Sequence, residues 1–475
     1  MKINHEIIRG YDLRGVVGKD LDAKITKRLG QSYGTYIKKK GVKKVIVGMD
    51  SRAHSEELKV ALINGLIETG LDVIDIGLTL VGHLYWSQYH FGTKGAIMIT
   101  ASHNPKEYNG FKMANDFSEA MIGQELINIV KHAEKNEFIK SEKKGQIQKI
   151  DLNNIYFDDL LKRIGFIKKF KVVIDSSHTT AGVIVPPLLR RAGCEVVESN
   201  CSLDSNFPLG VADPTETVVA ERLKDKILET KANIGFSYDA DGDRIGIVDE
   251  KGGIIWNDVL VALFAIDVLS KHPGEKIMYN TLCSKVVEDT IVKYGGQPFM
   301  WRTGHGFLKK KNQSVKAPFI GELSGHFFFS ADFYNHDDGC YATLKLLSYL
   351  SRTNQTLSEA VSKLPNYISS PEIKLFCADN KKIKLVEKIS PILKKDYPQA
   401  TVIDDERAGD GVRLDMPNSM FIIRYSQNGP YLTIKFEAKT EKKYEELKKY
   451  INNLLHQFPE IEWDNEIKVN IEALE

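Results

Sequence analysis

The amino-acid sequence predicts an α/β fold, in which three similar α/β domains with mixed, mainly parallel sheets and a C-terminal α+β domain surround a central cleft. Two patterns support this prediction: the same order of strands and helices occurs three times, and it changes after residue 365. The length agrees, because the chain has 475 residues and single hydrophobic cores stop growing near roughly 250–300 residues. We expect the domains at residues 1–150, 151–254, 255–366 and 367–475.

The first domain sets the repeated order. Lys44–Asp50 is an apolar run typical of a buried strand, and the amphipathic stretch Glu56–Glu68 ends before Gly70, as helices often do. Leu71–Gly77 and Gly95–Thr100 are two further strand-like runs. Strands that alternate with helices form mainly parallel sheets covered by helices, so such a sheet is expected here.

The later domains follow the same order and then depart from it. Strands are expected at Phe170–Asp175, Cys194–Glu198 and Ala232–Tyr238 in the second domain, and at Lys276–Tyr279, Gln297–Trp301 and Ala317–Ile320 in the third. A linker rich in proline and serine, Pro365–Pro371, precedes the fourth domain. That domain is predicted to be a smaller antiparallel sheet with two helices, with strands at Glu372–Phe376, Gly411–Asp415, Met420–Tyr425 and Tyr431–Glu437 and helices at Lys382–Lys395 and Glu441–His456.

Charge, cysteine content and hydropathy exclude several classes of protein. Sixty-five Lys and Arg residues nearly balance 63 Asp and Glu residues, so no nucleic-acid partner is expected. The five cysteines are scattered without a CxxC pair, which favours reduced thiols. The longest apolar run, Val259–Ile266, is far shorter than the roughly 20 residues of a membrane span, and Met1–Gly15 lacks an apolar signal segment. We expect a cytoplasmic protein without a membrane partner, and the sequence does not indicate an oligomeric state.

A polar loop follows the third strand of each α/β domain. The loops are Thr100–Pro105 (TASHNP), Asp239–Arg244 (DADGDR) and Gly321–His326 (GELSGH). Ligands of open α/β sheets bind beyond the carboxyl ends of the strands. We therefore expect the three loops to face one cleft.

The second loop has the pattern of a metal site. Asp239, Asp241 and Asp243 alternate, and carboxylates this close repel one another unless a hard cation such as Mg²⁺ neutralises them. A calcium-binding EF-hand is an alternative, since these residues and Glu250 fall at positions 1, 3, 5 and 12 of that motif. Arg244 occupies the position at which an EF-hand has glycine, and a strand-like segment precedes the loop. A solvated acidic turn is the third alternative.

The first loop offers a nucleophile. Ser102 is able to carry a phosphoryl group if a metal offsets the charge and nearby donors stabilise the transferring oxygens. His103 and Lys112 are such donors in this sequence. Without this context, Ser102 could equally be an ordinary surface or capping serine, and His103 could be an ordinary loop histidine.

Two further loops have the residues of a sugar-phosphate site. Glu322 and Ser324 alternate, so both side chains are expected on one side, where they would bind adjacent hydroxyl groups. Arg302–His305 adds a cation and an imidazole. Arg424–Gly429 (RYSQNG) is predicted to hold a phosphate. The alternatives are an ordinary polar turn for the former loop and a hairpin turn at Asn428–Gly429 for the latter.

Together these motifs resemble the α-D-phosphohexomutase superfamily, and within it the bacterial phosphomannomutase/phosphoglucomutase group, along essentially the whole chain. The resemblance implies a phosphoserine at Ser102 and Mg²⁺ bound by its phosphate and by Asp239, Asp241 and Asp243. It also implies catalytic roles for Ser102, His103, Lys112 and Arg244, and substrate binding by Tyr11, Arg14, His305, Glu322, Ser324, His326, Arg424, Ser426, Gln427 and Asn428, with Lys285 as a further candidate.

The implied reaction interconverts hexose 1-phosphate and hexose 6-phosphate, of mannose or glucose, through a hexose 1,6-bisphosphate. Glucose 1,6-bisphosphate or mannose 1,6-bisphosphate is the implied activator, and small hexose phosphates are the expected partners. Two departures from the group are Gln427-Asn428 in place of Asn-Thr, and Leu282 in place of a lysine for which Lys285 is the nearby substitute. The alternatives are a phosphoglucosamine mutase, which usually has Gln where Leu323 stands, a phosphatase and a noncatalytic sugar-phosphate-binding paralogue.

Overall fold

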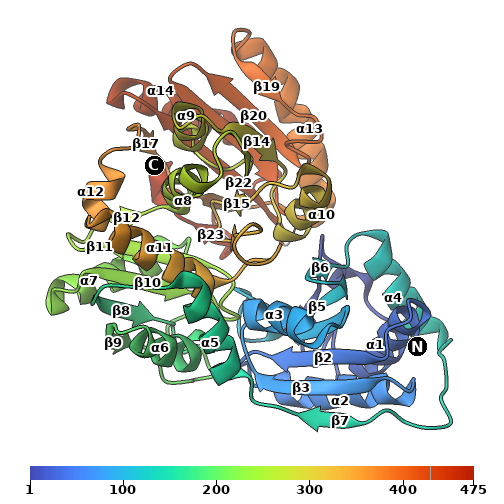
Figure 1. The fold of residues 1–475 in the computed structure, drawn as a ribbon. Coiled ribbons are helices and arrows are strands. Elements are labelled where there is room, and N and C mark those ends of the chain that lie inside the picture. The colour runs from blue at the N-terminus through green and yellow to red at the C-terminus, as the bar shows by residue number, and fades with distance from the viewer. Residues whose placement is uncertain (428, 475) are drawn as a thin grey trace.

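Four β-sheets follow one another along the chain in the computed structural model, which describes residues 1–427 and 429–474. In Figure 1 the first sheet is blue, the second green, the third yellow-green, and the fourth orange to red beside the third. The first three sheets are mixed and the fourth is antiparallel. The predicted fold class is therefore confirmed, whereas the domain boundaries stay predictions.

The first sheet has the strand order β1-β5-β4-β2-β3-β7, and β6 pairs with β5. Strands β2, β3, β4 and β7 run parallel, and β5 runs antiparallel beside β4. The elements are η1 (His5–Ile7), β1 (Leu13–Val16), α1 (Ala23–Lys39), β2 (Lys44–Met49), α2 (Ser55–Glu68), β3 (Asp72–Leu78), α3 (Val81–Phe91), β4 (Gly95–Ile99), β5 (Tyr108–Asp116), β6 (Glu119–Ala120), α4 (Gln124–Lys135) and β7 (Ile147–Lys149).

The apolar run of β2 is continuous because both faces of this strand are buried. Val45 and Val47 pack with Leu62 of α2 in one hydrophobic cluster. Ile46 points to the other face and packs in a second cluster with Leu84 of α3. Side chains of a strand alternate between the two faces of its sheet, so helices on both sides are needed to cover this strand.

The second and third sheets repeat this plan. Their orders are β12-β11-β10-β8-β9 and β14-β13-β15-β16. The elements are α5 (Asn153–Ile164), β8 (Lys171–Asp175), α6 (Ala181–Arg191), β9 (Glu195–Ser199), α7 (Thr217–Thr230), β10 (Ile234–Tyr238), β11 (Ile245–Asp249) and β12 (Ile254–Ile255), then α8 (Asn257–Lys271), β13 (Lys276–Asn280), α9 (Lys285–Lys293), β14 (Gln297–Trp301), α10 (His305–Val315), β15 (Phe319–Gly321), β16 (Phe327–Phe328), α11 (Gly339–Thr353) and α12 (Leu357–Val361).

The fourth sheet has the order β19-β20-β21-β22-β18-β23, and β17 pairs with β22. Its strand β17 lies inside the stretch predicted as a linker. The elements are β17 (Ile368–Ser369), β18 (Ile373–Phe376), α13 (Asp379–Asp396), β19 (Thr401–Ile403), β20 (Gly411–Met416), β21 (Ser419–Tyr425), β22 (Tyr431–Ala438), α14 (Glu441–Leu455), β23 (Lys468–Val469) and η2 (Ile471–Ala473).

The first three sheets share one hydrophobic core. A single cluster joins Met98 of the first sheet, Ile174 of the second and Phe319 of the third. The fourth sheet has a core of its own, formed by β18, β20, β21 and β22 together with α13 and α14. From the fourth domain, Ile422 joins the shared cluster and Tyr367 packs against it.

The cysteines agree with the prediction of reduced thiols. All five cysteines are free and buried, and burial raises the pKa of Cys194 and Cys377 to about 11 and that of Cys201 to about 12. None of the helices in the described part of the chain combines the length and the apolar character that a bilayer crossing requires.

Candidate active site

A cavity lies where the three polar loops meet the fourth domain. Each loop joins a central strand to its antiparallel neighbour: β4 to β5, β10 to β11 and β15 to β16. The predicted site residues that line the cavity are Tyr11, Arg14, Ser102, His103, Lys112, Arg244, His305, Glu322, Ser324, His326, Arg424, Ser426 and Gln427. The three loops thus share one cavity.

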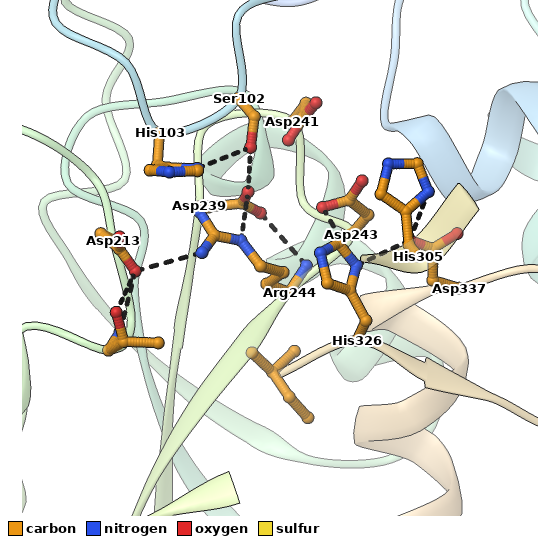
Figure 2. Close-up of polar contacts among 12 residues, drawn as sticks. Ser102, His103, Asp213, Asp239, Asp241, Asp243, Arg244, His305, His326 and Asp337 are labelled. Carbon is orange, nitrogen blue, oxygen red and sulfur yellow. Dashed lines mark hydrogen bonds and ion pairs between the residues drawn. The ribbon is translucent and has the colours of Figure 1, made fainter. Parts of the chain in front are cut away.

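Ser102 lies at the boundary between the first and second domains. Its hydroxyl donates to Asp239 Oδ2 at 2.8 Å and lies 3.2 Å from His103 Nδ1 (Figure 2). Its backbone has φ +49°, which residues other than glycine rarely adopt. The Ser102 amide donates to Thr100 Oγ1 at 2.9 Å, and that hydroxyl donates to Asp241 Oδ2 at 3.0 Å. These contacts turn the serine oxygen towards the acidic loop.

Two buried arginines donate hydrogen bonds to the serine loop. Arg52 Nη2 donates to the carbonyls of Ser102 and Asn104, both at 2.6 Å. Arg14 Nη1 donates to Ala101 O at 3.2 Å and to Asn104 Oδ1 at 2.6 Å. Since hydrogen bonds to charged donors are the stronger ones, the backbone of this loop is firmly fixed.

The three aspartates of the second loop are fully buried, and oxygens of Asp239, Asp241 and Asp243 lie within 4.8 Å of one another. Lys112 Nζ lies 2.8 Å from Asp241 Oδ2 and 2.5 Å from Asp243 Oδ2. Asp241 Oδ1 and Asp243 Oδ1 are buried and have no hydrogen-bond partner among the described residues. Buried carboxylate oxygens without partners fit a hard divalent cation, so this group has the composition of a metal site.

The strands that flank the acidic loop distinguish it from an EF-hand, and its burial shifts the pKa values of its aspartates. Strands β10 and β11 flank the loop, whereas helices flank the loop of an EF-hand. Burial, reinforced by Asp241 and Asp243, raises the pKa of Asp239 to about 7 in spite of Arg244. Burial also acts to raise the pKa of Asp241, but the Lys112 ammonium outweighs it and lowers that pKa to about 2.

Arg244 links the acidic loop to the fourth domain. Its Nε donates to Asp239 Oδ2 at 2.9 Å and its Nη1 donates to Asp213 Oδ1 at 3.2 Å (Figure 2). Asp213 also pairs with Lys374 of β18 at 3.0 Å. Arg244 Nη2 is buried and has no hydrogen-bond partner among the described residues, so this NH₂ group is left for a ligand in the cavity.

Glu322 and Ser324 of the third loop line the cavity, whereas Leu323 between them is buried in the shared core. Glu322 Oε2 accepts from the Gly304 amide at 3.0 Å, and its Oε1 is buried without a partner in the described chain. Burial raises the pKa of Glu322 to about 6. Both side chains are thus placed to bind a polar ligand.

His305 and His326 lie beside this loop. His326 Nδ1 lies 2.7 Å from Asp337 Oδ2, and His305 Nδ1 lies 3.9 Å from the same oxygen (Figure 2). His326 also lies 3.7 Å from Asp243. Burial lowers the pKa of His305 well below its usual value, so this imidazole is neutral near pH 7. The ring of Tyr11 contacts His305 edge-on at 4.4 Å between ring centroids.

Arg424 lies near the end of β21, where the predicted phosphate loop begins. Its Nε and Nη2 donate to the two oxygens of Asp410 at 2.8 and 2.5 Å. Gly411 permits this arrangement, because a Cβ there would lie 2.4 Å from Arg424 Cβ. Lys382 donates to Ser426 O at 2.6 Å and fixes the loop backbone. Asn428, also predicted to bind the ligand, lies outside the described residues.

Comparison with known proteins identifies the family. The three α/β/α domains of the phosphoglucomutase/phosphomannomutase family match in turn, domain I at residues 5–140, domain II at 154–253 and domain III at 256–367. A phosphomannomutase/phosphoglucomutase of Pseudomonas putida is 35% identical over 457 residues, which is 96% of this chain and 97% of that protein. The chain belongs to this family.

Further relatives agree. A phosphomannomutase/phosphoglucomutase of Pseudomonas aeruginosa is 36% identical over 452 residues, covering 94% of this chain and 95% of that protein. The crystal structure of a phosphoglucomutase/phosphomannomutase family protein of Burkholderia thailandensis superimposes with a TM-score of 0.84 at 32% identity, over 93% of this chain and 95% of that one. The family and the enzyme class predicted from the motifs, a mutase, are confirmed.

Lys285 differs from the other predicted site residues of this phosphoglucomutase/phosphomannomutase family member. It begins helix α9, its amide donates to Glu437 Oε1 at 2.7 Å, and it does not line the cavity. Leu282 lines the cavity instead. Lys285 therefore begins the helix that follows this lining position, and its role in substrate binding stays a prediction.

Several residues of the site escaped the sequence analysis. Lining residues that it missed are Thr215, Thr303, Gly304, Glu372, Lys374, Tyr431 and Thr433. Supporting residues that it missed are Arg52, Asp213, Asp337 and Asp410. Lys374, which lies among the apolar residues of β18, was the available signal.

Proposed function

We propose that this chain is a phosphohexomutase that interconverts hexose 1-phosphate and hexose 6-phosphate, of mannose or glucose, through phosphoserine at Ser102 and a hexose 1,6-bisphosphate. The observation that carries the proposal is one cavity that joins a serine hydroxyl, 2.8 Å from the acidic triad, to Arg424. The names of the relatives from Pseudomonas support the reaction.

The residues around Ser102 suit a phosphoryl group that carries about two negative charges. Asp239, Asp241 and Asp243 would hold Mg²⁺ together with that group, as the carboxylate oxygens without partners suggest. Bound Mg²⁺ would neutralise charge on the transferring oxygens. Lys112 and Arg244 add fixed positive charge on either side of the triad. The rigid serine loop then keeps the nucleophile in one orientation.

The remaining cavity residues would hold the sugar in two orientations. Ser102 is a single nucleophile, so the 1-oxygen and the 6-oxygen of the hexose must reach it in turn. Arg424 and Ser426 are proposed to bind the phosphate that is not reacting, and Glu322 and Ser324 to bind hydroxyl groups between the two ends. His103, Arg14, Tyr11, His305, His326 and Gln427 complete the proposed site, and Asn428 stays a prediction from the sequence.

The implied small molecules belong to the same proposal. Hexose phosphates are the expected partners, and glucose 1,6-bisphosphate or mannose 1,6-bisphosphate is the expected activator, because Ser102 must be phosphorylated before it donates. We also propose a cytoplasmic location, which the five free buried thiols support, since disulfides are rare in that compartment.

Two measurements test this function. Intact-protein mass spectrometry of the purified enzyme is expected to show a phosphate adduct that disappears in Ser102→Ala, and the variant is expected to lose nearly all turnover. Turnover rates with mannose 1-phosphate, glucose 1-phosphate and glucosamine 1-phosphate, each measured with its 1,6-bisphosphate activator, identify the preferred sugar. Turnover of Ser102→Ala at the wild-type rate would refute the proposal, and a preference for glucosamine 1-phosphate would favour a phosphoglucosamine mutase.

A further inference from the structure

Three side chains form a cross-strand row on the fourth sheet. Lys374 on β18 pairs with Thr433 on β22, and Thr433 pairs with Arg424 on β21. Directly paired residues of antiparallel strands project from the same face of the sheet, and all three line the cavity. Neighbouring strands lie roughly 4.8 Å apart, so the long side chains of Lys374 and Arg424 are able to reach one group held over Thr433.

The middle residue of this row has an unused hydroxyl. Thr433 is fully buried, and its Oγ1 has no hydrogen-bond partner among the described residues. A buried hydroxyl without a partner destabilises the free protein. An oxygen of a ligand in the cavity would satisfy it.

The two cations beside Thr433 also keep donors for a ligand. Lys374 Nζ donates to Asp213 Oδ2 at 3.0 Å, and an ammonium has three donors. Asp213 is shared between Lys374 and Arg244. Arg424 uses Nε and Nη2 on Asp410, and within the described chain no contact occupies its Nη1. An ammonium, a hydroxyl and a guanidinium with spare donors suit a dianionic phosphate.

We infer that Lys374 and Thr433 are substrate-binding residues that, with Arg424, hold the phosphate that is not being transferred. This inference rests on the proposed mutase function and adds two residues to its phosphate site. The row explains why an apolar strand of the fourth sheet carries a buried lysine, and why the neighbouring strand carries a buried hydroxyl without a partner.

A structural role of Lys374 is the competing explanation, because Lys374 contacts Asp213 and thereby Arg244. Loss of a residue that only positions Arg244 would lower kcat and leave KM unchanged. Loss of a phosphate ligand would raise KM for mannose 1-phosphate and mannose 6-phosphate together. Thr433 separates the two roles further, since its hydroxyl binds nothing in the described part of the free protein.

The test combines steady-state kinetics with calorimetric titration of mannose 6-phosphate. Thr433→Val is expected to raise KM and Kd roughly 2- to 10-fold while the melting temperature stays the same or rises, because a neutral hydrogen bond to the ligand is lost and a buried unpaired hydroxyl is removed. Lys374→Met is expected to raise both constants roughly 10- to 100-fold, as for a charged ligand.

Matched controls lie in the first domain. Thr26 is a buried threonine of α1 whose hydroxyl also lacks a partner within the described residues, so Thr26→Val should leave KM unchanged. Lys59→Met removes a buried ion pair with Asp75 and should leave KM unchanged as well. Affinity and KM of Thr433→Val equal to wild type would overturn the inference alone, as would a Lys374→Met defect confined to kcat. Wild-type enzyme that neither binds nor converts hexose phosphates would overturn the proposed function and this inference together.

Discussion

The first three domains form the base of the molecule. The interactions that join these three domains to one another differ from those that attach the fourth domain to the base. One hydrophobic cluster runs through the base, whereas buried polar contacts attach much of the fourth domain. Arg413 Nη1 donates to the carbonyls of Thr281 and Cys283, both at 2.6 Å, and Lys435 pairs with Asp258 at 3.0 Å. Polar interfaces between domains resemble transient ones and allow relative movement.

The proposed chemistry is divided in the same way. Ser102 and the acidic triad lie on the base, where the shared core fixes their relative positions. The proposed ligands of the non-reacting phosphate lie on the fourth domain. We therefore expect changes at Ser102 and the acidic triad to act on turnover, and changes at the phosphate ligands of the fourth domain to act on substrate binding.

The largest effect on turnover is expected on the base. Asp241→Asn removes a charge from the proposed metal site, so kcat should fall roughly 10²- to 10³-fold, as when charge stabilisation of a transferring group is lost. Rates measured across a Mg²⁺ titration check this. Asp225→Asn, on an exposed position of α7, is the control and should retain full activity. Full wild-type activity in excess chelator would contradict the metal assignment.

The next prediction concerns the stability of the contact between the fourth domain and the base. Arg413→Met leaves two carbonyls and Asp415 without their buried partner, which should destabilise the fourth domain by about 3–5 kcal/mol. Differential scanning calorimetry should then show a separate, earlier transition. Arg407→Met removes an exposed pair with Asp405 and should change stability by less than about 0.5 kcal/mol. One transition that shifts as a whole would show that the base and the fourth domain unfold as a unit.

A smaller effect is expected at the phosphate loop. Arg424→Ala should raise KM for mannose 1-phosphate and mannose 6-phosphate together, by the roughly 1.5–3 kcal/mol of a charge-assisted contact. The kinetics of both directions decide the outcome, and Arg407→Ala serves as a control on the same domain. A defect in one direction only would mean that Arg424 serves a single substrate orientation.

The smallest effect tests a buried charge on the base. The folded-state pKa of Glu322 is raised to about 6, so its favourable contribution to folding is complete below its ordinary value, near 4.5, and is lost as pH rises through 6. Glu322→Gln should therefore be about 1–2 kcal/mol more stable than wild type at pH 8 and gain nothing at pH 4. Urea unfolding at both pH values measures this. An equal gain at both would exclude ionisation as the cause.

The sequence predicted those parts of the site that depend on short stretches of neighbouring residues. The strands before the three loops follow from continuous apolar runs, and the loops follow from their unusual composition. Strand β5 was missed because Tyr108–Asp116 is polar and lacks such a run. The structure buries most of this strand beside the site, where Lys112 meets the acidic triad.

The rest of the site depends on contacts between distant segments. Arg52 holds a loop 50 residues further along the chain, and Lys374 meets Asp213 across 161 residues. The row of Lys374, Thr433 and Arg424 exists only in the register of three paired strands. Neither hydrophobic periodicity nor motif spacing contains that register, so the sequence did not show that Lys374 and Thr433 lie beside Arg424.

The five buried thiols make the two parts of this molecule easy to label. Thiolates are the reactive form of cysteine, and thiols with pKa values near 11 or above hold almost none of it at pH 7. Cysteines introduced at Glu57 of α2 and Glu445 of α14, both exposed, would therefore react selectively with fluorophores. Energy transfer between the two dyes would then report the distance from the base to the fourth domain during turnover, with every native cysteine retained.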